Sequence, residues 1–334
     1  MRGGVLVAVT LAVAAGGAEG SFGGRGVDRV SAVSARIRLI KAPGRGAFTD
    51  VAWLPSFRRL AVTYAAGTSP AQGRFVAVIG LDGRGFRRLP LWRDPACPIQ
   101  VTSMPRPRPD GTLAYLHACW GNAARVPNRI TSLLAYDGRT GRNWRLVRYF
   151  LPQSGARYDA SSLGDLVASE GDTFTGRLFR LDPHRQTPLS NGLRGTGLVS
   201  WSPDGHRMVA DAREHPGVEG ADGRDLYLLS RSGTVIRKLA RGLNSVSRAG
   251  WSPDGRQLAV AMQPAGGRYG IWLIDVRSSR RRLILGGSDL EAPIWLPDGT
   301  TLVAPVGSLS RFPPLPGQRR PPNSPVGLYV IKLN

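Results

Sequence analysis

Trp251-Ser252-Pro253-Asp254-Gly255 is the stretch that decides the fold of this 334-residue chain, because close copies of it recur along the sequence. The clearest copies are Trp201-Ser202-Pro203-Asp204-Gly205 and Trp295-Leu296-Pro297-Asp298-Gly299, and a short apolar run follows each of them. A unit that repeats every forty to fifty-odd residues cannot bury its own apolar face, so its copies must stack against one another. The sequence therefore predicts a repeat architecture.

One copy of the repeat has the pattern of four antiparallel strands. An apolar strand ends at Trp251, and the Pro-Asp-Gly sequence that follows is typical of a tight turn. Residues 258–261 begin the returning strand, and residues 271–274 and 281–284 predict a third and a fourth strand. Four such strands make one blade of a β-propeller.

The same four-part order can be followed six times along the chain. The three remaining copies are degenerate, and they are Trp53-Leu54-Pro55-Ser56, Pro109-Asp110-Gly111 and Ser161-Ser162-Leu163-Gly164-Asp165. The other third strands are predicted at residues 76–79, 133–136, 178–181, 226–229 and 328–331. Outer strands follow after polar turns, with a basic residue before a leucine at 88–89, 145–146, 238–239 and 282–283. Six blades result, and the third, around residue 161, departs furthest from the pattern.

The two ends of the repeat region predict how the blades are joined. The last copy reaches Asn334 before a fourth strand can form, whereas residues 35–40 near the other end have the pattern of an outer strand without its blade. Pairing between these two segments would close a ring and cover strand edges that otherwise invite aggregation. We therefore expect an all-β, six-bladed propeller closed by an N-terminal outer strand on the C-terminal blade.

These motifs resemble those of a known family. The Trp-Ser-Pro-Asp-Gly turn, the Leu-Tyr-Val-Ile third strand at 328–331 and the basic-leucine outer strand resemble the TolB-type, WD-like β-propeller repeat over residues 35–334. The resemblance implies the six-bladed fold of periplasmic TolB proteins and of accessory domains in prolyl-oligopeptidase-like enzymes. TolB proteins also share an extra N-terminal domain that is not recognisable here. The resemblance therefore implies only the fold and a general interaction role.

The N-terminal residues have the pattern of an export signal. A basic residue, Arg2, is followed by an apolar stretch from residue 5 and a small-residue exit near residue 20. The apolar stretch is short for a membrane span. We therefore expect a signal peptide at 1–20, a flexible lead at 21–34 and one propeller domain at 35–334. The protein would be secreted or periplasmic, without a transmembrane span.

Two cysteines flank the turn at 109–111. Export to an oxidising compartment favours a cross-strand disulfide between Cys97 and Cys119 over two unpaired thiols. The midpoint of the two cysteines differs slightly from the centre of the predicted hairpin, so such a disulfide requires a β-bulge.

The chain is strongly basic, with a formal net charge of +22. Arginine supplies 42 of the 45 basic residues, and a GC-rich genome explains that preference as well as selection for an anionic partner does. The arginines are dispersed, and the longest run is at 280–282, whereas a nucleic-acid groove needs clustered cations between aromatics. We therefore expect incidental contacts with anionic cell-wall polymers or lipid, and no nucleic-acid partner.

The candidate binding surface is the face that carries the long, uneven loops. The second-to-third connections are long at 120–128, 211–225 and 305–325, and such loops on a rigid ring are typical of recognition surfaces. Polar residues just ahead of the inner strands would line the channel mouth there, and they are Asp50, Asp159, Arg248, Asp289 and Glu291. The alternative is that these groups only hydrate the channel. Trp120, in the first long loop, is the aromatic contact candidate.

Other prominent residues have structural interpretations. The aspartates of the Pro-Asp-Gly turns are expected to bond to their own backbone, and the motif tryptophans to pack between blades.

The sequence gives little support to an enzyme. It contains no Gly-x-Ser-x-Gly elbow, and its four histidines, at 117, 184, 206 and 215, lack metal-ligand spacing. Convergence of Asp50, Asp159 and Glu291 on the axis would instead indicate a carbohydrate lyase or a metal-assisted hydrolase. We expect a monomeric, non-catalytic propeller without metal or cofactor, which binds a protein or peptide partner through its long-loop face.

Overall fold

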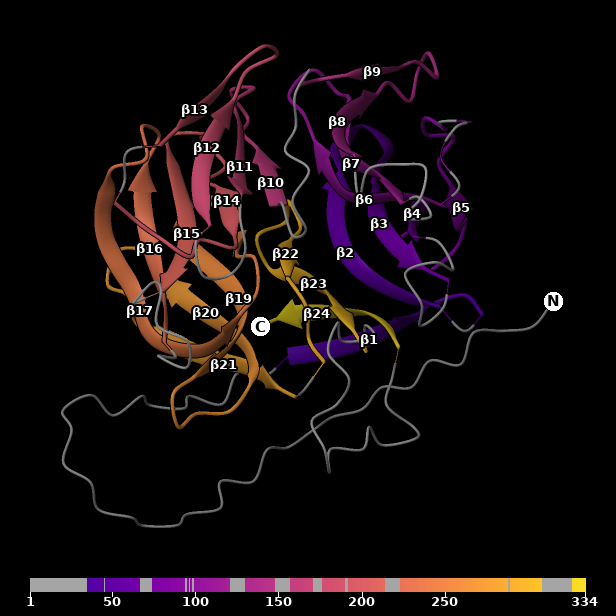
Figure 1. The fold of residues 1–334 in the computed structure, drawn as a ribbon. Coiled ribbons are helices and arrows are strands. Elements are labelled where there is room, and N and C mark those ends of the chain that lie inside the picture. Colours follow the sequence, from indigo (N-terminus) through magenta and orange to yellow (C-terminus); the bar gives the residue numbers. More distant parts are fainter. Residues whose placement is uncertain are drawn as a thin grey trace, which may run out of the picture.

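The structure is a computed structural model that describes residues 35–44, 46–66, 74–93, 95, 97, 99–120, 130–147, 157–170, 176–189, 192–213, 223–287, 289–307 and 326–334 (Figure 1). Throughout these ranges the chain forms antiparallel β-sheets, and the one helical element is a 3-10 turn, η1 (Pro55–Phe57). The predicted signal peptide and lead lie outside the described residues. So does most of each long loop.

Three four-stranded sheets follow one another along the first half of the chain, each with its strands paired in chain order. Sheet I contains β2 (Ala47–Leu54), β3 (Arg59–Ala65), β4 (Arg74–Ile79) and β5 (Arg87–Arg88). Sheet II contains β6 (Ile99–Pro107), β7 (Leu113–Trp120), β8 (Ile130–Tyr136) and β9 (Asn143–Arg145). Sheet III contains β10 (Arg157–Ala160), β11 (Leu166–Glu170), β12 (Arg177–Leu181) and β13 (Gln186–Pro188).

The next sheet has eight strands because two four-strand runs are joined by pairing of β17 with β19. The first run, sheet IV, contains β14 (Val199–Trp201), β15 (Arg207–Arg213), β16 (Arg224–Ser230) and β17 (Val235–Val246). The second run, sheet V, contains β18 (Gly250–Trp251), β19 (Gln257–Pro264), β20 (Gly270–Asp275) and β21 (Arg281–Gly286). The predicted inner, second, third and outer strands are present in both runs.

The last sheet, sheet VI, combines both ends of the described chain. It contains β22 (Ile294–Trp295), β23 (Thr301–Val306) and β24 (Gly327–Leu333), and β1 (Ala35–Lys41) is its outer strand. β1 pairs antiparallel with β24 from Ala35 opposite Leu333 to Lys41 opposite Gly327. The predicted pairing of the two terminal strands is therefore confirmed, while no sheet in the described structure closes on itself.

The hairpin turns between first and second strands are held as predicted by their aspartates. Asp204 accepts hydrogen bonds from Ser202 Oγ (2.5 Å) and the His206 N–H (3.0 Å). Gly205 takes the left-handed backbone conformation at φ 70°, which glycine adopts at little cost. In sheet I, where the Asp-Gly pair is missing, η1 forms the turn and Arg58 takes the left-handed position at φ 49°.

The core consists of apolar clusters between neighbouring sheets. The motif tryptophans take part in them: Trp201 packs between sheets III and IV, and Trp251 between sheets IV and V. A further cluster packs Phe48 and Val51 of sheet I against Leu328 of sheet VI. The chain's first and last sheets are therefore packed together, and the predicted packing role of the tryptophans is confirmed.

Both cysteines of the chain form the predicted disulfide, Cys97–Cys119, with their Cα atoms 5.6 Å apart. The bulge that their spacing requires is present in β6, where the register with β7 shifts between Ser103 and Arg106.

Candidate functional site

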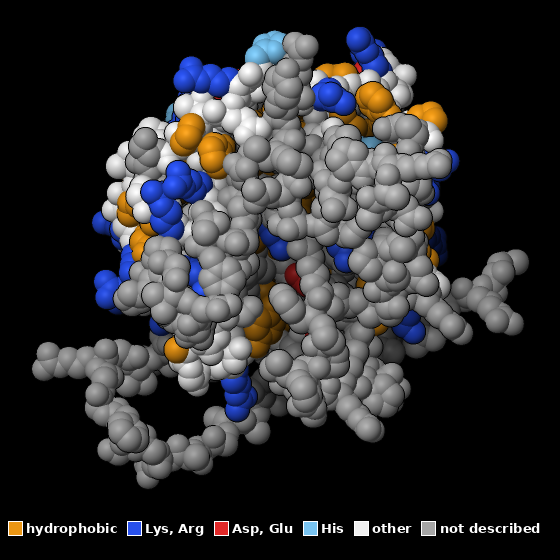
Figure 2. Space-filling model, in the orientation of Figure 1, with side chains coloured by type: hydrophobic (Ala, Val, Ile, Leu, Met, Phe, Trp, Pro, Cys, Tyr) orange, Lys and Arg blue, Asp and Glu red, His pale blue; other side chains and the backbone are white. Residues whose placement is uncertain are grey.

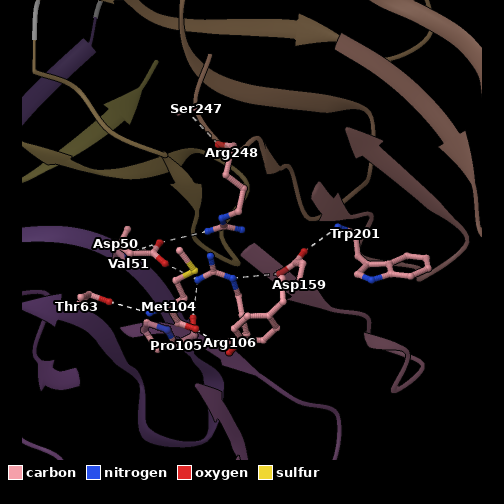
Figure 3. Close-up of polar contacts among 11 residues, drawn as sticks. Asp50, Val51, Thr63, Met104, Pro105, Arg106, Asp159, Trp201, Ser247 and Arg248 are labelled. Atoms are coloured by element: carbon pink, nitrogen blue, oxygen red, sulfur yellow. Dashed lines mark hydrogen bonds and ion pairs between the residues drawn. The ribbon is translucent and has the colours of Figure 1, made fainter. Parts of the chain in front are cut away.

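A buried arginine joins three sheets, and Figure 3 shows its contacts. Arg106 Nη1 on β6 lies 2.9 Å from Asp50 Oδ2 on β2, and its Nε lies 3.2 Å from Asp159 Oδ1 on β10. Arg248, ahead of β18, places Nη2 3.8 Å from Asp50 Oδ1. We call these four residues the central ion-pair cluster. It connects sheets I, II, III and V.

The bulge in β6 explains how Arg106 reaches this position. Met104, inside the bulge, has φ 53°, a left-handed conformation that is uncommon for a residue other than glycine. Its backbone is held on both sides, because its N–H donates to Thr63 Oγ1 (3.0 Å) and its carbonyl accepts from the Tyr158 hydroxyl (2.7 Å). A bulge changes the direction of the side chains that follow it, and here it directs Arg106 to the two aspartates.

The electrostatics of the cluster follow from burial and charge pairing. Burial alone would lower the pKa of Arg106, but the carboxylates of Asp50 and Asp159 outweigh it and raise this pKa above the usual value. Burial and the like charge of Arg106 lower the pKa of Arg248, against the opposing effect of both carboxylates. Two guanidinium groups thus face two carboxylates, and the cluster is balanced in charge.

Backbone amides satisfy further oxygens of the two carboxylates. The Val51 N–H donates to Asp50 Oδ1 (2.8 Å), and the Trp201 N–H on β14 donates to Asp159 Oδ2 (2.8 Å). Both aspartates are therefore bonded on two sides, which is what buried carboxylates require.

Three of the five residues predicted at the channel mouth, Asp50, Asp159 and Arg248, lie together in the cluster. The sequence analysis missed Arg106, the central member of the cluster, because the alternation of a regular strand does not predict that this side chain points inward. The need for a bulge, read from the cysteine spacing, was the one signal in the sequence that could have indicated it.

The other two predicted residues, Asp289 and Glu291, lie on the segment between β21 and β22. Burial raises the pKa of Tyr269, the residue before β20 of sheet V, and the carboxylates of Glu291 and Asp289 raise it further. Burial lowers the pKa of Arg74, the first residue of β4, and Glu291 opposes that effect. Glu291 is therefore within electrostatic reach of sheets I and V.

Trp120 differs from its prediction. It is the last residue of β7, opposite Ile99, whereas we expected it in a loop. Residues 121–129 and the indole of Trp120 lie outside the described structure.

A cavity of about 750 Å³ lies on the face that carries the hairpin turns, which we call the turn-face cavity. Four sheets contribute turn residues to its wall: Ser56, Pro109, Ser162 and Pro203. Its apolar wall is formed mainly by Leu54, Phe57, Phe86, Leu113, Tyr136 and Trp201. The volume is typical of ligand sites, and a mainly apolar lining with a few polar groups is typical as well.

The turn-face cavity adjoins the central ion-pair cluster. Pro107 and Ala160, which line the cavity, directly follow Arg106 and Asp159 in the chain. Trp201 also lines the cavity, and its backbone N–H is bonded to Asp159. The ion pairs therefore fix the strand ends from which this part of the cavity wall is built.

The charged residues that line the cavity are all cationic: Arg59, Arg87 and Arg108. Arg108 is neutralised locally, with Nη1 2.8 Å from Asp110 Oδ2. Arg59 Nη1 donates to the Gly85 carbonyl (3.1 Å) and has no carboxylate partner in the described part of the chain. The exposed guanidinium of Arg87 has no ion-pair partner there either, so the cavity presents a net positive charge.

Two buried donors at the cavity wall have no acceptor among the residues that the structure describes. They are the indole Nε1 of Trp201 and Nε of Arg108. Elsewhere, the basic side chains on the face shown in Figure 2 are scattered among apolar and neutral ones and form no single patch.

The three histidines that the structure describes lie in different places. His117 lies on β7 with Nε2 3.2 Å from Gln100 Oε1, His184 and His206 lie in turns, and position 215 falls outside the described ranges. Within those ranges, no three His, Cys, Asp or Glu side chains are placed to share a metal ion. A search for helices long and apolar enough to cross a membrane also found none in the described residues.

Comparisons with known proteins find related folds. No family model and no curated protein matches the sequence. Among solved structures, TolB from Acinetobacter baumannii is similar with a TM-score of 0.53 at 15% identity over 87% of this chain and 64% of its own. Hydrazine synthase from Kuenenia stuttgartiensis is similar with a TM-score of 0.53 at 15% identity over 80% of this chain and 75% of its own.

A third similar structure, a gluconolactonase from Xanthomonas campestris, has a TM-score of 0.52 at 14% identity over 92% of both chains. The match with the Acinetobacter TolB covers 64% of that protein, so this chain spans less than two thirds of its length. The structural likeness establishes a TolB-like β-propeller fold. The names of the similar proteins include those of enzymes, and at these identities the likeness concerns the fold alone.

Proposed function

We propose that this TolB-like β-propeller is an exported, non-catalytic protein that binds a segment of a partner protein in its turn-face cavity. The observation that carries the proposal is the cavity itself. It is about 750 Å³ in volume, its wall is mainly apolar, and its strand ends are fixed by ion pairs. Preorganised apolar cavities with a few polar groups are the usual form of a binding site.

The architecture that we propose is one domain, residues 35–334, in a closed ring of six blades. Three kinds of contact support it: four-strand order in sheets I to VI, pairing of β1 with β24, and the apolar cluster between sheets I and VI. The Cys97–Cys119 disulfide supports export, since disulfides persist in oxidising compartments.

A binding role is favoured over the enzyme alternative by the bonding of the carboxylates of Asp50 and Asp159. An acid or base catalyst needs a carboxyl group free to exchange protons with a substrate. Asp50 and Asp159 are instead both ion-paired to Arg106 and bonded to backbone amides. These bonds favour a structural role for both aspartates.

The choice of face also changes from the sequence-based prediction. The long-loop face remains a prediction, because residues 121–129, 214–222 and 308–325 lie outside the described structure. The turn-face cavity is built entirely from described residues, so we assign binding to it.

Site-specific photo-crosslinking tests the proposal. A photoreactive phenylalanine analogue replaces Phe57, which lines the cavity and is 45% exposed. The matched control carries it at Ile236, which is 51% exposed on β17. We expect illumination of producing cells to give a discrete crosslinked protein from position 57 and none from position 236. Crosslinks from both positions, or from neither, would contradict the assignment of the cavity.

A further inference from the structure

We infer that the segment bound in the turn-face cavity is acidic and apolar, with a carboxylate placed at Arg59 and Arg87 beside an apolar side chain. The inference rests on the proposed function and specifies the chemistry of the same site. Its first support is charge complementarity, because the lining contains three arginines and no acidic residue. Of these three arginines, only Arg108 has a carboxylate partner in the described structure.

The two arginines without a carboxylate partner lie on one part of the wall. Arg59 begins β3 and its guanidinium lies over Gly85, to whose carbonyl it donates. Arg87 follows Gly85 by two residues and begins β5. Both therefore belong to the turn-side end of sheet I. Arginine binds a carboxylate through paired, charge-assisted hydrogen bonds, so a carboxylate is the ligand group that this end of the wall favours.

The apolar requirement comes from the remaining wall. Phe57 is exposed, an unusual state for a large apolar side chain, and its ring lies against Gly138 of the β8–β9 turn. Beside the wall, Leu163 follows the lining residue Ser162 on the turn of sheet III; it is 48% exposed and lies against Gly205. An exposed apolar surface with a polar rim is typical of a protein-binding site. An apolar side chain of the partner would complete the contacts of Phe57.

A peptide with an acidic and an apolar side chain accounts for both features of the wall better than a purely anionic polymer does. A phosphate-rich or uronic-acid polymer would pair with the arginines but would leave the apolar wall in water. A fatty acid also carries a carboxylate and an apolar chain, and failure of the selection described below to enrich acidic, apolar peptides would favour it over a peptide. We therefore commit to an acidic, apolar segment of a partner protein.

Selection from a phage library of random linear dodecapeptides tests the inference on the purified protein. We expect the enriched peptides to combine Asp or Glu with a large apolar residue. The best of them, synthesised with a fluorescent label, is then titrated by anisotropy. Replacing both cations, in Arg59→Gln/Arg87→Gln, should weaken its binding at least about tenfold, because two charge-assisted contacts are lost.

Matched controls separate the possible failures. Arg36→Gln/Arg241→Gln removes the same charge at exposed positions that do not line the cavity, and it should leave binding within about twofold of the parent. Ser162→Trp fills the cavity and should abolish binding, with circular dichroism as the check on folding. Peptides without acidic residues, or equal weakening by the two arginine pairs, would overturn the inference while the proposed function stands. Unchanged binding to Ser162→Trp would contradict the proposed function itself.

Discussion

Arg106 Nη1 lies 2.9 Å from Asp50 Oδ2, although the two residues are 56 positions apart and belong to different sheets. Because the same guanidinium also pairs with Asp159, removing it would leave two buried carboxylates with Arg248, 3.8 Å from Asp50, as the one remaining counter-charge of the cluster. We predict that Arg106→Met lowers the free energy of unfolding by about 3–5 kcal/mol, measured by urea denaturation. Arg139→Met, which removes an exposed pair with Asp137, is the control and should cost less than about 1 kcal/mol. Equal losses of unfolding free energy in the two variants would show that the buried ion pairs of Arg106 stabilise the fold no more than the exposed pair does.

The turn of sheet I offers a stabilising substitution. Arg58 occupies the left-handed region at φ 49°, where a side chain is strained and glycine is not. Arg58→Gly should therefore raise the free energy of unfolding by up to about 1 kcal/mol. Gly205→Ala, at φ 70° with a Cβ that would meet Leu163 Cγ at 2.7 Å, should have the opposite sign. Thermal denaturation of both variants measures the two changes in stability. A loss of stability in Arg58→Gly would mean that the contacts of the Arg58 side chain outweigh the strain of its backbone.

Reduction of the disulfide should destabilise the folded protein. Cys97 and Cys119 are separated by 22 positions. Opening a loop of this size lowers the free energy of unfolding by about 3 kcal/mol, because the unfolded chain gains conformational entropy. We expect the Cys97→Ser/Cys119→Ser variant to lose that amount in urea denaturation and to become insensitive to dithiothreitol. A parent protein whose stability does not change with reductant would refute this estimate.

Buried tyrosines predict a loss of stability at high pH. Burial raises the pKa of Tyr115 from 10.0 to about 12, against a small opposing effect of its hydrogen bond from the Trp92 N–H. The unfolded chain therefore loses this proton first, so the contribution is complete below pH 10 and is lost as the pH rises toward 12. The free energy of unfolding should fall over this interval, and it should fall less in Tyr115→Phe. Parallel curves for parent and variant would exclude this tyrosine as a cause.

Removal of β1 should expose the edge of β24. The backbone groups of β24 that pair with residues 35–41 would then be free to pair with another molecule. We predict that a chain starting at residue 42 associates in light-scattering measurements, whereas a chain starting at residue 35 stays monomeric. A monomeric chain without β1 would indicate that the edge of β24 is protected in another way.

Repetition made most of the strands predictable. The Pro-Asp-Gly turns and the apolar runs after them are local signals, and even the degenerate copy at 161–165 forms the expected hairpin. The place of Arg106 was not predictable in this way, because it depends on a bulge in β6 held by Thr63 and Tyr158 from two other sheets.

The cavity was missed for a different reason. Its wall uses the turn residues of several sheets, such as Ser56 and Pro203, and sequence patterns explain each of these by its own hairpin alone. Only the packing of neighbouring sheets shows that the turns surround a common space. That Asp50, Asp159 and Arg248 come together could be expected from the sequence, because each has a similar position relative to an inner strand of the repeat.

The pairing of Ala35 with Leu333 also has a consequence for the order in which the sheets can form. Strands β2 to β21 can assemble as the chain is synthesised, since each pairs with a near neighbour in sequence, but β1 must wait for β24. Until then the molecule has an unpaired first strand and an incomplete last sheet, and completion of sheet VI depends on the synthesis of β24.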